Sequence, residues 1–255
     1  MTVRFILGVV VPYVSWSVFV LGLAWRTGSW LRRPVPVSIT LLPGPSSRVG
    51  RPAAMASELL AFRSLWRGDR RLWLAAWLTH LALAVVLAGH VAGIATLAGQ
   101  FCWLGASAAT SVLWSKALGL AGGSGLLVLL AILALRRVTI PELRRLSDPS
   151  DYFALALLLA VAGTGMALRL AGPEVDLAAV RGYLAGLIVL RPVELPAVPL
   201  LVTHLTLFHI LLLYFPFSKL MHVTGGIVSR ELVLRPAPVY PTPAGFQPDA
   251  GFRRL

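Results

Sequence analysis

All five histidines of the chain fall within two apolar stretches: His80 and His90 lie in one, and His204, His209 and His222 lie in the other. Ionisable side chains inside a membrane are costly and rare, so a cluster of them indicates a functional site. A neutral imidazole can bind a metal ion or pass on a proton. The sequence therefore predicts either a metal or cofactor site or a proton relay between the two stretches.

The spacing of the histidines determines which of them can meet. A helix turns by about 100° per residue, so the step from His204 to His222 makes about five whole turns and puts both imidazoles on one face. His209 points roughly 140° away from that face, and we expect it to form a hydrogen bond in the core or between helices. If the two stretches are antiparallel helices, His80 pairs with His222 and His90 with His204.

The residues YFPFSKLMH, which end on His222, must bring this last histidine into position. Ten residues of helix rise about 15 Å and eighteen rise about 27 Å, so two straight helices do not match both pairs. Pro216 has no N–H for the carbonyl of Leu212, so we expect a kink that turns His222 inward. Ser218 or water would then satisfy the freed carbonyl, and Lys219 would extend to the membrane interface.

The composition sets the class of protein. With 57% hydrophobic residues, 13% charged residues and a mean hydropathy of +0.80, the chain is too apolar for an ordinary soluble domain. Predominantly apolar stretches long enough to cross a bilayer core of roughly 30 Å occupy residues 5–25, 73–94, 112–135, 152–171 and 200–221. We predict an all-α integral membrane protein in which residues 1–235 form one five-helix bundle. Residues 236–255, rich in Pro and Gly, should form a cytoplasmic tail.

The net charge of +13 comes from an uneven distribution of the 23 basic residues. Most of them follow the first stretch, separate the third from the fourth, or follow the fifth. The positive-inside rule makes these segments cytoplasmic, which places the N-terminus outside and the C-terminus in the cytoplasm. The charge therefore reflects topology and attraction to anionic lipid, and we expect no nucleic acid as a partner.

Cofactor chemistry is narrowed by the presence of a single cysteine, Cys102. The chain can form no internal disulfide, bind no iron–sulfur cluster and attach no haem covalently. Two stacked sites of two histidines each suit the iron of non-covalent haem, whereas zinc or copper would need three or four ligands in one place. No Asp or Glu lies within the five stretches, which disfavours the alternative of a transporter with a histidine proton relay.

The segments that connect the apolar stretches also carry structural predictions. Residues 26–54 are rich in Pro, Arg and Gly and predict an irregular loop. Residues 55–68 have apolar side chains at helical spacing and predict a short amphipathic helix at the inner interface or under a partner. Residues 171–199 contain an apolar stretch too short to cross, which predicts a re-entrant or surface helix over a pocket near the outer face.

Several sequences resemble those of a known family. The 10- and 18-residue histidine spacings are similar to those of the gamma subunit of respiratory nitrate reductase, a five-helix dihaem cytochrome b. The chain resembles more closely the related membrane cytochrome b subunit of the dissimilatory sulfite-reduction complex. The resemblance covers most of the chain and rests on PYVSWSVFVLGLAWR (12–26), LLAFRSLWRGDRRLWLAAWLTH (59–80), DYFALALLLAVAGTGMALR (151–169) and YFPFSKLMH (214–222).

The resemblance implies two b haems, one near each face of the membrane. His90 and His204 would be the axial ligands of the outer haem iron, and His80 and His222 those of the inner haem iron. No counterpart of His209 is recognised in the family.

The resemblance also implies that menaquinol is oxidised beside the outer haem. The quinol site of nitrate reductase uses a glycine just before the outer ligand, which matches Gly89, and a lysine. Lys116 is the candidate for that lysine, although its spacing from His90 differs from the family's. Arg169 would either pair with a haem propionate or extend to the interface.

By the same resemblance, the chain is the quinol-oxidising or quinone-reducing subunit of an oxidoreductase complex in a prokaryotic cytoplasmic membrane, and is not complete alone. Its partner would be a cytoplasmic iron–sulfur subunit resembling heterodisulfide reductase, docked on the arginine-rich region 26–71 and the tail. Further membrane and outer-side subunits would join the complex. The direction of electron flow stays open, and a nitrate reductase anchor is the nearer alternative.

Overall fold

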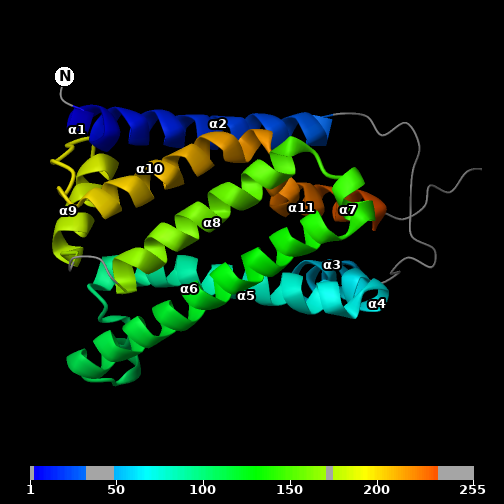
Figure 1. The fold of residues 1–255 in the computed structure, drawn as a ribbon, viewed down its shortest axis with the longest axis horizontal. Coiled ribbons are helices and arrows are strands. Elements are labelled where there is room, and N and C mark those ends of the chain that lie inside the picture. The colour runs from blue at the N-terminus through cyan, green and yellow to red at the C-terminus, as the bar shows by residue number, and fades with distance from the viewer. Residues whose placement is uncertain (1–2, 33–48, 171–174, 235–255) are drawn as a thin grey trace, which may run out of the picture.

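The computed structural model describes residues 3–32, 49–170 and 175–234, and these ranges are helical apart from their connections (Figure 1). Within them, five segments are long and apolar enough to cross a membrane. These segments are Val3–Arg32, Arg70–Thr96, Ala108–Thr139, Pro149–Leu170 and Pro199–Phe217. The five predicted spans are confirmed as helices. The first runs seven residues further than predicted, because Arg26 to Arg32 continue the helix instead of starting a loop.

The elements in chain order are α1 (Val3–Phe5), the π-helical turn η1 (Ile6–Val10), α2 (Val11–Arg32), α3 (Gly50–Ala61), α4 (Arg63–Gly68), α5 (Arg70–Thr96), η2 (Gln100–Leu104), α6 (Ala108–Thr139), α7 (Pro141–Arg145), α8 (Pro149–Leu170), α9 (Leu177–Ile188), α10 (Pro199–Tyr214), η3 (Phe215–Phe217), η4 (Lys219–Met221) and α11 (His222–Val233). N-cap side chains start four of them: Asp69 caps α5, Ser107 caps α6, Asp176 caps α9 and Ser218 caps η4. Each oxygen accepts backbone N–H groups that have no partner within the helix.

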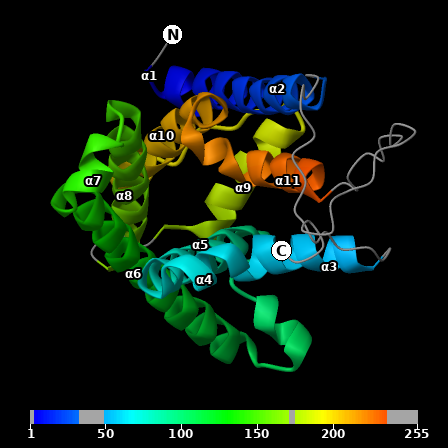
Figure 2. The same cartoon turned by 90° about the vertical axis from the view of Figure 1, so that its right-hand side faces the viewer.

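The long helices pack in a row, with α5 on α6, α6 on α8, α8 on α10 and α10 on α2. Seen from the end of the bundle, α2 and α10 lie on one side and α5 on the other, with α6 and α8 joining them (Figure 2). Small residues allow the close crossings: a Cβ on Gly22 would lie 2.7 Å from Cβ of Pro216, and Gly123 lies directly under Met166. Because α6 and α8 lie between them in this row, α5 and α10 face each other across the bundle without packing closely.

The two ends of the bundle differ. Helix α9 lies beside α1 at one end, and α3, α4, α7 and α11 gather at the other (Figure 1). We call these the α9 end and the α4 end. Large apolar side chains are exposed along the helices between them, for example Leu21 at 68% and Leu135 at 64%. Such an apolar surface suits contact with lipid.

The prediction of one continuous amphipathic helix over residues 55–68 is wrong. It is divided into α3 and α4 at Phe62, whose φ of 49° and ψ of 46° are left-handed. The prediction of a loop over 26–54 is also partly wrong, since both ends of that range are helical and residues 33–48 lie outside the described residues. The break at Phe62 depends on contacts with α5, which helical periodicity within the segment does not reveal.

The end of the fifth span also differs from the prediction. Pro216 does not kink a continuing helix. The α-helix ends at Tyr214, two short 3-10 turns follow, and α11 begins at His222. Ser218 donates to the carbonyl of Phe215 at 2.9 Å rather than to that of Leu212. The backbone of Ser218 is extended (φ −107°, ψ 174°), so the chain leaves the helical path of α10 before it reaches His222.

The segment over residues 171–199 contains a helix, as predicted, and this helix, α9, packs against α5. Its Tyr183 is buried and donates to the carbonyl of Gly8 at 2.8 Å, which ties α9 to the first segment. A hollow of about 450 Å³ lies beside it, lined in part by Arg4, Tyr183 and Glu194. The predicted tail over 236–255 lies outside the described residues.

Candidate functional site

Two pairs of histidines face each other across the bundle. The ring centres of His80 and His222 are 5.8 Å apart with their planes at 87°, and those of His90 and His204 are 6.3 Å apart with their planes at 16°. These are the two pairings that an antiparallel arrangement predicts. The first pair lies toward the α4 end and the second toward the α9 end. Their role as ligands stays a prediction.

The α5 histidines are oriented by their own helix. Nδ1 of His80 lies 2.8 Å from the carbonyl of Ala76, and Nδ1 of His90 lies 2.7 Å from the carbonyl of Val86. A carbonyl only accepts, so each Nδ1 carries the proton and donates it. The other ring nitrogen, Nε2, is then unprotonated and free to bind a metal ion.

The partner histidines are oriented by side chains and turns. Nδ1 of His222 lies 3.1 Å from the carbonyl of Lys219 and donates to it. Nδ1 of His204 lies 3.0 Å from Oγ1 of Thr164, whose hydroxyl donates to the carbonyl of Ala160 at 2.8 Å. The threonine oxygen is therefore left to accept from His204. All four histidines share one tautomer, with Nε2 available.

The spacing of the rings fits a bound metal ion. Metal–imidazole bonds are about 2 Å long and a nitrogen lies roughly 1 Å from its ring centre, so an ion between two imidazoles separates the ring centres by roughly 6 Å. Among the described residues, no group of three or more His, Cys, Asp and Glu side chains is placed to hold a metal ion. A group that brings its own equatorial nitrogens and needs only two axial imidazoles fits these pairs, and haem is such a group.

The second pair is bordered by small residues and cations. A Cβ on Gly165 would lie 3.1 Å from Cε1 of His204, so only glycine fits against the imidazole without displacing it. A Cβ on Gly89 would meet no atom within 4 Å. Toward the α9 end, the Arg169 guanidinium lies over Gly119 of α6. Lys116 is exposed on α6, about one turn before Gly119 toward the start of the helix.

The first pair has an aromatic neighbour to which the sequence assigned no role at the site. The ring of Phe62 packs edge-on against the imidazole of His80, with ring centres 5.0 Å apart and planes at 83°. Phe62 is the residue at which α3 and α4 separate, and its sequence neighbours gave it only the role of an apolar helix position. The left-handed conformation and the ring contact together could be found only from the structure.

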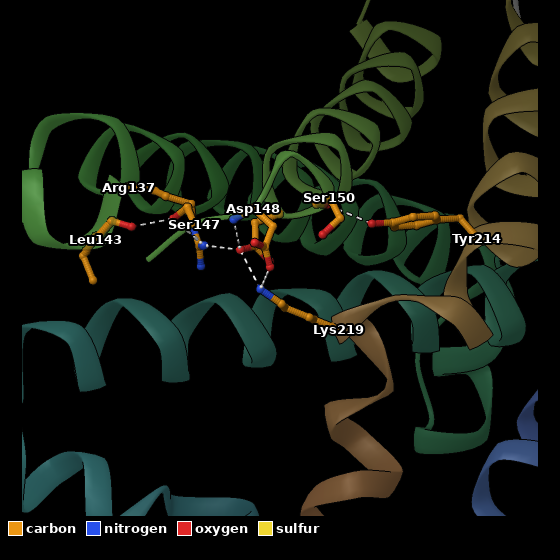
Figure 3. Close-up of polar contacts among 8 residues, drawn as sticks. Arg137, Leu143, Ser147, Asp148, Ser150, Tyr214 and Lys219 are labelled. Atoms are coloured by element: carbon orange, nitrogen blue, oxygen red, sulfur yellow. Dashed lines mark hydrogen bonds and ion pairs between the residues drawn. The ribbon is translucent and has the colours of Figure 1, made fainter. Parts of the chain in front are cut away.

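A cluster of charges supports the turn that carries His222 (Figure 3). Nζ of Lys219 lies 2.8 Å from the Asp151 carboxylate and 2.9 Å from that of Asp148. Arg137 lies 3.0 Å from the same Asp151 oxygen. These hydrogen bonds, first to Asp151 and then to Asp148, raise the pKa of Lys219. Lys219 is exposed, as expected at an interface, but the ion pairs with α8 and the α7–α8 connection are a feature that the sequence prediction missed.

His209 lies on the opposite face of α10 and joins no pair. It is 5% exposed, and its Nδ1 lies 2.8 Å from Oγ of Ser15 on α2. Ser15 is fully buried and donates to the carbonyl of Pro12 at 3.0 Å. The predicted inter-helix hydrogen bond of His209 is confirmed.

Five long apolar helices define a multi-pass membrane protein, and its two facing histidine pairs fit a protein of the cytochrome b class. Comparison with known families agrees: residues 56–241 match the nitrate reductase gamma subunit family. The chain belongs to that family. It is a membrane cytochrome b subunit of an electron-transferring oxidoreductase complex.

Individual relatives refine this placement. The Hdr-like menaquinol oxidoreductase cytochrome b-like subunit of Archaeoglobus fulgidus is 31% identical over 260 residues, covering 88% of this chain and 78% of the relative. The protein of the same name from Archaeoglobus profundus is 24% identical, covering 84% and 74%. The nitrate reductase gamma chain of Bacillus subtilis is 30% identical over 177 residues, covering 67% and 76%.

Proposed function

We propose that this chain is the dihaem cytochrome b subunit of a quinone-linked respiratory complex. The observation that carries the proposal is the presence of two histidine pairs at two depths of one bundle, each imidazole with Nδ1 hydrogen-bonded. His90 and His204 would hold one haem b, and His80 and His222 the other. When bound, haem supplies one-electron redox chemistry at a potential that axial ligands and burial tune.

The distribution of charge supports an orientation in a prokaryotic cytoplasmic membrane. Basic side chains gather at the α4 end, among them Arg63, Arg67, Arg144 and Arg145. By the positive-inside rule this end faces the cytoplasm and the α9 end faces outward. The N-terminus is then outside and the C-terminus inside, and the pair His90 and His204 lies nearer the outer face.

Menaquinol would bind near that outer pair, in agreement with the names of two relatives. Gly89 leaves the backbone beside His90 open to a ligand, and Lys116 places a cation near the same end. A lysine ammonium can donate to a quinol oxygen and stabilise the negative charge that forms as a proton leaves. Arg169, one turn beyond the Thr164 that orients His204, would neutralise a haem propionate.

Electrons would leave the chain at the cytoplasmic face. One cysteine cannot hold an iron–sulfur cluster, so the next carrier must belong to a partner. The names of the Archaeoglobus relatives support a partner of the heterodisulfide reductase type. The exposed Arg63 and Arg67 on α4 would contact it. Reversal of both charges should release the iron–sulfur partner during purification while haem is retained. In the control, reversal of the charges of Arg144 and Arg145 on α7 should leave the partner bound. Co-purification of the partner with both variants would refute this docking site.

The substrate of the complex lies with its other subunits. A sulfite-reducing or sulfur-metabolising complex is our first proposal, and an anchor for nitrate reductase is the second, favoured by the Bacillus subtilis relative. A histidine proton relay is the alternative from another class. It is less well supported, because no carboxylate within the described ranges bonds to any of the four paired histidines.

Reduction by a quinol tests the function directly. The purified chain is mixed without oxygen with menadiol, a soluble menaquinol analogue, and haem absorbance is followed. We expect the wild type to be reduced and Lys116→Ala to be reduced about 10–100-fold more slowly, the effect of losing a charge-assisted hydrogen bond. Arg181→Ala, at the same end of the bundle, serves as the control and should react normally. Haem that dithionite reduces and menadiol does not would refute the quinol assignment.

A further inference from the structure

Phe62 occupies an unusual position for its residue type. Its backbone is left-handed, which side chains with a Cβ rarely adopt and which glycine adopts without strain. A break between two helices does not require phenylalanine. The surrounding structure must therefore hold this residue in place, and the benefit must come from its ring.

Two tryptophans of α5 support the break. Nε1 of Trp73 donates to the carbonyl of Ala61 at 2.7 Å, and Nε1 of Trp77 donates to the carbonyl of Leu60 at 3.0 Å. These carbonyls end α3 and lose their helical partners where the chain turns at Phe62. The two indoles thus satisfy the last two carbonyls of α3 before Phe62 and fix the end of α3 against α5.

Polar contacts fix the other side of the break. The Glu58 carboxylate accepts from the backbone N–H of Ser64 at 3.1 Å, so a side chain of α3 caps the start of α4. Arg230 of α11 lies 3.2 Å from the same carboxylate, and its side chain is only 28% exposed. The segment that carries Phe62 is therefore fastened to α5 and to α11, the two elements that contribute His80 and His222.

We propose that Phe62 is a positioning residue for the histidine pair at the α4 end: its ring holds the His80 imidazole edge-on and keeps water from that side of the pair. This inference rests on the proposed function, because it assigns the ring a role beside a haem ligand. Trp73, Trp77 and Glu58 hold the strained backbone that delivers the ring. The outer pair has no such aromatic cover among the described ring contacts.

The chemistry gives the direction of the effect. Oxidised haem iron carries one more positive charge than reduced iron, so water entering the site stabilises the oxidised form and lowers the potential. Removal of the ring should therefore lower the potential of the haem bound at His80 and His222. The haem bound at His90 and His204 should keep its potential.

A set of substitutions separates the ring from the backbone. Phe62→Gly relieves the left-handed strain and removes the ring, Phe62→Leu keeps the strain and removes the ring, and Phe62→Tyr keeps the ring. Phe101→Leu is the matched control, because it removes an edge-on aromatic contact with Trp114 at the α9 end. Each purified protein is titrated potentiometrically, and the electron paramagnetic resonance of its oxidised haems is recorded.

We expect Phe62→Gly and Phe62→Leu to raise the ratio of oxidised to reduced inner haem about tenfold at a fixed solution potential. This change corresponds to a fall of about 59 mV in the midpoint potential of that haem. Their low-field resonance for that haem should shift, and Phe62→Tyr and Phe101→Leu should match the wild type. Two haems with unchanged potentials in both ring-free variants would refute the role of Phe62 alone. A wild type without haem would refute the proposed function as well.

Discussion

Asp148 and Asp151 offer a matched test of what fastens the turn before His222. Both carboxylates contact Nζ of Lys219, at 2.9 Å and 2.8 Å. The Asp151 side chain is 6% exposed, whereas that of Asp148 is 68% exposed. Asp151 also contacts Arg137 and accepts the backbone N–H of Asp148 at 3.1 Å. The buried carboxylate should therefore matter far more than the exposed one.

The magnitudes follow from exposure. An exposed ion pair contributes about 0–1 kcal/mol, and loss of one partner from a fully buried pair costs about 3–5 kcal/mol. Lys219 is 62% exposed and Arg137 is 36% exposed, so the Asp151 pairs lie between these limits. We expect Asp151→Asn to lower the free energy of unfolding by about 1–3 kcal/mol and Asp148→Asn by less than about 0.5 kcal/mol.

The assay is equilibrium unfolding of the purified chain in mixed micelles with increasing denaturing detergent, followed by circular dichroism. Lys219→Met, alone and combined with each Asn substitution, completes two double-mutant cycles. The coupling energy with Asp151 should exceed the coupling energy with Asp148. Equal losses for the two Asn variants, or a neutral Asp151→Asn, would refute the reasoning from burial.

Two further predictions concern other hydrogen bonds. Ser15→Ala removes the buried partner of His209 and should lower the free energy of unfolding by about 0.6–1.7 kcal/mol in the same assay, the range found for inter-helix hydrogen bonds in a membrane protein. In the background of His209→Phe the same substitution should cost much less, and an equal cost would show that the bond is unimportant. Backbone N–H groups, that of Leu72 first, lower the pKa of Asp69 below its usual 3.8, so this group stabilises the fold at pH values above its unfolded pKa and the effect is lost as pH falls through the folded pKa. The melting temperature of wild type should therefore exceed that of Asp69→Asn at pH 6, and the difference should shrink as the pH falls below 3.8. A difference independent of pH would contradict the assignment.

The sequence predicted the features that depend on composition and period. The length of the apolar stretches was enough to locate the five helices. The antiparallel topology and the angular spacing of residues around a helix were enough to pair His80 with His222 and His90 with His204. His209 was correctly separated from both pairs by its angle on α10. These features depend on local sequence and on the membrane, and both are visible in a linear sequence.

The rest depends on tertiary contacts. Pro216 signalled an irregularity, but the helix ends there because Arg26 donates to the freed Pro216 carbonyl at 2.9 Å and Ser218 turns back to Phe215. The left-handed Phe62 is held by indoles of another helix. The binding of Lys219 to Asp151 joins residues that are far apart in sequence, so no local pattern predicts it.

Haem content of single histidine variants tests the central assignment most directly. Dithionite-reduced minus oxidised spectra and a pyridine haemochrome assay give the type of haem and the amount per chain. We expect two b haems in the wild type and in His209→Asn, and one in His222→Ala and in His204→Ala. A wild type without haem, or variants at His222 and His204 that both keep two, would contradict the assignment of these histidine pairs as axial ligands.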